Sequence, residues 1–125
     1  KNRRYGESQV ARIILINMVK SSLQLDTIIS LMKYINGSVE DESDDIIPDK
    51  ELFNMLCYVI YQADEKHTFG TDEFKAIISD TIKDYKGPAK DSKKRLESAL
   101  LIMSLAYISG TIQQKAQGEC EKIGL

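Results

Sequence analysis

The sequence of 125 residues contains no tryptophan, one histidine, two prolines and two cysteines. Two cysteines, Cys57 and Cys120, are too few for the disulfide framework of a small secreted domain. Their separation also excludes the CxxC spacing of a metal knuckle or a redox motif. We therefore expect free thiols, no cofactor and a soluble, intracellular protein of the cytoplasm.

The sequence motifs of common enzyme classes are missing as well. No P-loop, GxGxxG, GxSxG or HExxH occurs, which removes the usual sequence indications of nucleotide, hydrolase or zinc chemistry. The one histidine, His67, lies in a polar turn and is the only imidazole that could activate a nucleophile such as Cys57. Cys57 is expected on a buried helix, where desolvation makes a thiol unreactive. We therefore expect that the protein is not an enzyme.

A strong charge of one sign is also lacking. The 17 basic and 19 acidic residues give a net charge of -2, so the whole chain has no general attraction to nucleic acids or anionic membranes. Hydrophobic content of 42% and charged content of 29% are ordinary for a globular protein, and the length fits one domain. Any charged partner must therefore be recognised by a local patch.

One uncharged run, SALLIMSLAYI from Ser98, is apolar on almost every face of a helix. A helix of this kind must be enclosed on several sides, by other helices or by lipid. A membrane span needs about 20 apolar residues, and this run is bounded by charged residues at 93–95 and polar residues from 109 onward. We therefore expect no contact with a membrane and a buried central helix at about 92–109.

Apolar residues at helical spacing predict the other elements. Asp49 and Thr71 can cap the third and fourth helices, and Asp26 can cap the second. Gly87 and Pro88 end the fourth helix. The first two helices could also form one bent helix, because neither Gly nor Pro separates them. In addition to the central helix, the sequence predicts helices at 9–21, 26–36, 49–62 and 71–86, and a half-buried last helix after Gly110.

No segment shows the strict alternation of a half-buried strand. We therefore predict an all-α single domain over residues 1–125, a bundle of five to six helices around the central helix. Residues 1–8 are expected to form a flexible basic N-terminus, and residues 38–48 an exposed acidic loop.

The acidic loop shows a partial resemblance to the calcium-binding loop of EF-hand proteins. Glu40, Glu42, Asp44 and Glu51 fall at positions one, three, five and twelve of such a loop. Asp45, however, occupies the position where that family has the glycine of its sharp turn. A solvated negative loop is the preferred interpretation, and calcium binding by residues 40–51 is kept as an alternative.

A basic run formed by Lys90, Lys93, Lys94 and Arg95 lies at the start of the central helix, where the helix dipole disfavours cations. These side chains can extend into water, pair with the acidic loop or bind a nucleic-acid backbone. The sequence lacks the regular basic stripe and aromatic platform typical of nucleic-acid binding. Binding of nucleic acid through residues 90–95 is therefore an alternative rather than the preferred function.

A small helical domain without a catalytic constellation is most typical of a protein interaction module, such as an assembly subunit, adaptor, inhibitor or immunity-type protein. Its partner would be another protein or a second copy of the chain. Tyrosines combine apolar area with a polar tip and are frequent in interface hot spots. Four tyrosines could serve in this way or pack at the edge of the core, namely Tyr34, Tyr58, Tyr61 and Tyr85. The candidate partner-binding residues are Lys93, Lys94, Arg95, Tyr58 and Tyr61.

Overall fold

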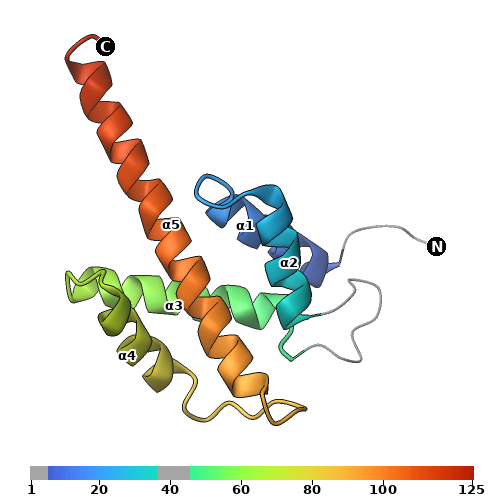
Figure 1. The fold of residues 1–125 in the computed structure, drawn as a ribbon. Helices are drawn as coiled ribbons and strands as arrows, with labels where there is room; N and C mark the ends of the chain where they lie inside the picture. The colour runs from blue at the N-terminus through green and yellow to red at the C-terminus, as the bar shows by residue number, and fades with distance from the viewer. Residues whose placement is uncertain (1–5, 37–45) are drawn as a thin grey trace.

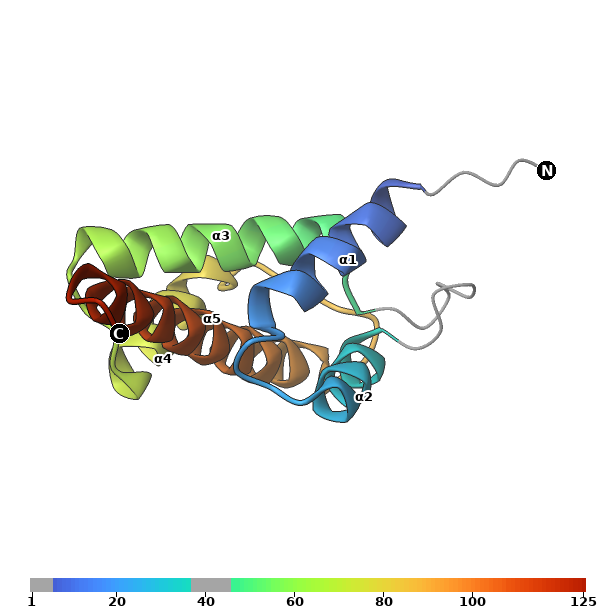
Figure 2. The same ribbon diagram turned by 90° about the horizontal axis from the view of Figure 1, so that it is seen from above.

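A computed structural model of the chain describes residues 6–36 and 46–125, and these residues form five α-helices and no strand. The prediction of an all-α single domain is therefore confirmed. The helices are packed together, with the second and fourth helices on opposite sides of the last helix and the first helix beside the third (Figures 1 and 2). They are α1 (Glu7–Val19), α2 (Leu25–Ile35), α3 (Asp49–Glu65), α4 (Thr71–Thr81) and α5 (Ser92–Lys122).

The C-terminal helix α5 organises the bundle, as predicted, because it contacts each of the other four helices. Its fully buried apolar residues recur at intervals of three and four residues, which places them on one face. Burying each large side chain of this face contributes roughly 1.5–3 kcal/mol. The opposite side of α5 is more open than the sequence indicated, because Ile102 is 40% exposed. The buried apolar residues of α5 are Leu96, Ala99, Leu100, Met103 and Ala106.

The helices α3 and α4 supply a large part of the core that faces α5. Leu52, Leu56 and Val59 lie on one side of α3 and are completely buried. Phe74 and Ile78 of α4 are equally enclosed, and both helices pack against α5. The opposite face of α3 is exposed, so this helix is less buried than the sequence predicted.

The second half of α5 projects beyond the bundle, which differs from the separate last helix predicted after Gly110 (Figures 1 and 2). The glycine does not interrupt the helix because its missing side chain serves packing. A Cβ at Gly110 would lie 2.2 Å from Oγ of Ser21 and 3.3 Å from Oγ of Ser22. The glycine therefore lets α5 approach the turn between α1 and α2 closely. Beyond Gly110 the helix is mostly exposed rather than half-buried.

Several helix ends also differ from the predicted ones. The helices α1 and α2 are separate, because the backbone N–H groups of Ser22 and Leu23 both donate to the carbonyl of Val19 and close a tight turn. Gln24 rather than Asp26 is the N-cap of α2, so the carboxylate lies in the first turn. Similarly, the N-caps of α3 and α4 are one residue earlier than predicted.

The helix α4 ends at Thr81 instead of continuing to residue 86. The reason is a long-range contact, since the Tyr85 hydroxyl donates a hydrogen bond to the backbone carbonyl of Ile46. Ile46 and Ile47 were placed by the sequence in the exposed loop, yet both side chains are buried in the core. At the other end of the chain, α1 begins at Glu7, within the segment predicted to be flexible.

Among the described residues, α5 is the one helix with the length and apolar content to cross a membrane. A core helix of a globular domain meets the same criteria, and 39% of its most apolar stretch is buried in this bundle.

Candidate protein-binding groove

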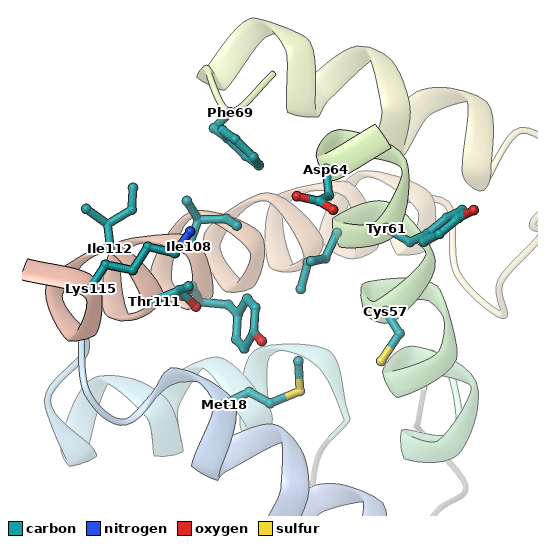
Figure 3. Close-up of a pocket in the computed structure, with 11 residues that line it drawn as sticks. Met18, Cys57, Tyr61, Asp64, Phe69, Ile108, Thr111, Ile112 and Lys115 are labelled. Atoms are coloured by element: carbon teal, nitrogen blue, oxygen red, sulfur yellow. The ribbon is translucent and has the colours of Figure 1, made fainter. Parts of the chain in front are cut away.

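An open, largely apolar groove of about 390 Å³ lies where α3 and α5 run beside the end of α1 (Figure 3). We call it the α3–α5 groove. Its volume falls within the range of ligand and peptide sites. The groove is lined by Met18 of α1, by Cys57, Ile60, Tyr61 and Asp64 of α3, by Phe69 in the following turn, and by Tyr107, Ile108, Thr111, Ile112 and Lys115 of α5.

The two walls of the groove follow from helical periodicity. Cys57, Tyr61 and Asp64 are separated by four and three residues, so their side chains share one face of α3. Ile108, Ile112 and Lys115 of α5 have the same spacing. Because α3 and α5 contact one another, these two faces form opposite sides of one depression.

The end wall depends on how α3 terminates. The N–H of Thr68 donates to the carbonyl of Ala63 and the N–H of His67 to that of Asp64, at 3.0 and 3.1 Å. His67 has a φ of 53°, in the left-handed region that ends many helices. This Schellman arrangement reverses the chain and places Phe69 at the rim of the groove. The backbone of His67 thus shapes the turn that ends α3, whereas its side chain is exposed.

Several apolar side chains of the groove are open to solvent. Tyr61 is 58% exposed, Ile112 57% and Phe69 42%. Large aromatic and aliphatic side chains gathered on one surface are typical of interaction sites, whereas scattered ones are ordinary. The groove therefore offers apolar area that the described residues leave uncovered.

Cys57 lies in the wall of the groove and is half-buried, less deeply than the sequence indicated. Burial raises the pKa of its thiol above the ordinary value of 9.0. The thiol is consequently protonated near neutral pH and a poor nucleophile.

The groove carries one acid and one base, Asp64 on α3 and Lys115 on α5. Figure 3 shows them on opposite sides of the depression. Within the described chain, neither side chain takes part in an ion pair or a side-chain hydrogen bond. Both charges are therefore free to meet a partner that carries the opposite sign at matching positions.

The tyrosines that the sequence singled out do not form one surface. Tyr61 lines the α3–α5 groove, whereas Tyr58 lies in a shallow depression beside Asp80 and Lys83. Tyr85 is tied to the backbone of Ile46 within the fold.

The residues of the basic run at the start of α5 also lie in different surroundings rather than on one surface. Nε of Arg95 donates to the carbonyl of Tyr34 at 3.0 Å, and the guanidinium lies 5.5 Å from the centre of the Tyr34 ring. This contact satisfies a carbonyl at the C-terminus of α2, where a cation is also favoured by the helix dipole. Nζ of Lys93 donates to the carbonyl of Lys83 at 3.2 Å. Lys94 lies in a separate depression between α4 and α5.

A buried polar cluster escaped the sequence reasoning. Nε of Arg12 lies 2.7 Å from Oδ2 of Asp49, and Nδ2 of Asn36 donates to Oδ1 of Asp49 at 2.9 Å. Oδ1 of Asn36 accepts the N–H groups of Ile46 and Ile47 at 3.0 and 3.2 Å. The cluster joins α1, α2 and α3 and has a structural role. The sequence shows an Arg on the apolar stripe of the first helix, but it does not show that the carboxylate of Asp49 is the partner of this Arg.

Half of the predicted calcium loop at 40–51, including Glu40, Glu42 and Asp44, lies outside the described residues. In its described part, the carboxylate of Asp49 is engaged by Arg12 and Asn36, and Glu51 is exposed. Elsewhere in residues 6–36 and 46–125, no three His, Cys, Asp or Glu side chains gather as metal ligands.

Comparison of the chain with protein-family models, with curated proteins and with solved structures finds no match.

Proposed function

We propose that this chain is a non-enzymatic protein interaction module and that its partner binds in the α3–α5 groove. The observation that carries the proposal is the continuity of the groove with the projecting half of α5. Ile112 belongs to both, and beyond it most residues are exposed as far as the end of the helix. A small ligand would need only the groove, whereas a protein partner would also cover the projecting helix.

The composition of the groove supports the same proposal. Tyr61 and Phe69 supply rigid aromatic area, which costs little side-chain entropy to immobilise and is common at interface hot spots. The charges of Asp64 and Lys115 can fix the orientation of a partner. Burial of apolar area gives roughly 25 cal/mol per Å² before the cost of association is subtracted.

Binding of nucleic acid has weaker support. Arg95, the residue best suited to phosphate, is engaged by Tyr34 in the fold. Lys93 and Lys94 lie in different surroundings, so the run does not form the continuous stripe that tracks a backbone.

Affinity capture from the native cell extract tests the proposal with three forms of the full chain. The wild type is compared with Ile112→Asp, which places a charge in the groove, and with Gln113→Asp, the same new charge at an exposed position outside it. Both residues are more than one-third exposed, so we expect both variants to remain folded by circular dichroism.

We expect the wild type and Gln113→Asp to retain the same partner and Ile112→Asp to lose it. Equal retention by all three forms would show that the groove is not the binding site. A partner lost equally by both variants would attribute the loss to charge alone and would contradict the proposal as well.

A further inference from the structure

We propose that the occupant of the α3–α5 groove is a second copy of this chain, related to the first by a two-fold axis. Each copy would place the exposed part of its α5 against the groove of the other. The inference rests on the proposed function and specifies its partner.

The charges of the groove are the first argument. Asp64 and Lys115 are the two charged residues that line it, they lie on different helices, and neither is paired within the described chain. In a two-fold interface, residue i of one copy meets residue j of the other, and j meets i in return. Two copies facing each other across the groove can therefore form the pair Asp64–Lys115 twice. A foreign partner would need to carry the same two charges in the reversed arrangement, whereas a second copy has them already.

The projecting half of α5 is the second, independent argument. Most side chains after Gly110 are exposed, so this half of α5 has few contacts with the other described helices. Ile112, Ala116, Cys120 and Ile123 recur every three or four residues, so they form one stripe along this half. The stripe begins in the groove at Ile112 and ends with Ile123, which is 75% exposed.

The stripe and the groove therefore form one continuous apolar surface on each copy. A two-fold axis between Asp64 and Lys115 would lay the stripe of each α5 against the groove of the other copy. The arrangement covers the helix that the monomer leaves open, and it fills the groove with side chains of the same chain. The aromatic residues Tyr61 and Phe69 would then contact the apolar stripe of the second copy.

Sedimentation equilibrium of the full chain tests this arrangement at about 150 mM salt, from roughly 1 to 100 μM. We expect the wild type to dimerise. In Asp64→Lys both groove charges are positive, and in Lys115→Asp both are negative, so each variant should dimerise at least about tenfold more weakly than the wild type. Lys75→Asp, the same change of charge at an exposed position of α4 outside the groove, should dimerise like the wild type.

An equimolar mixture of Asp64→Lys and Lys115→Asp provides the decisive measurement. Every cross-pair in the mixed dimer joins opposite charges, so the mixture should recover dimers that neither variant forms alone. Recovery would support the two-fold pairing directly, because two unfolded or generally weakened variants cannot restore one another.

A monomeric wild type would overturn the inference, and so would a dimer that is insensitive to both groove substitutions or is not recovered in the mixture. The proposed function is judged separately. If the wild type is monomeric but captures a protein that Ile112→Asp does not capture, the groove remains a binding site for a different partner. A monomer that captures nothing through the groove removes both proposals.

Discussion

The amide of Asn36 offers the sharpest test of the forces that hold the fold together. Its side chain is completely buried and makes three hydrogen bonds, accepting the N–H groups of Ile46 and Ile47 and donating to Asp49. It thereby fixes the chain immediately before α3 to the end of α2. The replacement Asn36→Ala removes all three bonds while leaving the backbone of residue 36 free to keep its conformation.

The expected loss of stability follows from the groups that are left behind. The N–H of Ile47 loses its acceptor, and the N–H of Ile46 keeps only a longer bond of 3.4 Å to the carbonyl of Ile35. An orphaned buried donor costs about 1–3 kcal/mol. The carboxylate of Asp49 loses one of its donors but keeps Arg12 at 2.7 Å. Partial relaxation lowers the sum, so we expect Asn36→Ala to reduce the free energy of unfolding by about 2–5 kcal/mol. Such a loss is a large fraction of the roughly 5–15 kcal/mol that stabilises a typical domain.

Urea denaturation followed by circular dichroism measures the effect. With a slope of about 2 kcal/mol per molar urea, the midpoint should fall by about 1–2.5 M. Asn17→Ala is the matched control, because Asn17 is exposed on α1 and its replacement leaves no buried group unpaired. A reduction below about 0.5 kcal/mol, equal to that of the control, would refute the structural role of the cluster.

Three further predictions address the core, the Tyr85 contact and the projecting helix. Met103→Asp should unfold the domain, because it buries an unpaired charge at a cost of several kcal/mol, whereas Ile102→Asp on the same helix should remain folded by circular dichroism since that residue is 40% exposed. Burial raises the pKa of Tyr85 above its ordinary 10.0, so the folded state holds the phenolic proton more tightly than the unfolded state. This contribution to the free energy of unfolding is complete below about pH 10 and is lost as pH rises through the pKa of the folded state. Urea denaturation at increasing pH should therefore show a smaller loss of stability in Tyr85→Phe than in the wild type. Gly118→Ala should raise the helix content of α5 by circular dichroism, because a Cβ there meets no atom within 4 Å and alanine favours a helix by about 1 kcal/mol. An unchanged or lower signal would contradict the open space beside this residue.

The sequence by itself determined the elements of this fold, because helical periodicity is a local property. The apolar spacing of Phe74, Ile77 and Ile78 predicted the buried face of α4. The uncharged run from Ser98 predicted the helix around which the others pack, because such a run must be covered. The sequence could not locate the end of α4, since Tyr85 continues the apolar spacing and is held elsewhere by the carbonyl of Ile46.

Only the tertiary structure decided which distant residues meet. Gly110 looked like an end of the central helix, but its role depends on the approach of Ser21, which no local pattern reveals. Arg12 and Asp49 are 37 residues apart, and their pairing required the packing of α1 beside α3. For the candidate site, the sequence singled out Tyr61 as a candidate partner-binding residue but could not join it to Ile112. That groove exists because two helices with independent periodicities pack side by side, and their relative rotation is set by the core rather than by either helix alone.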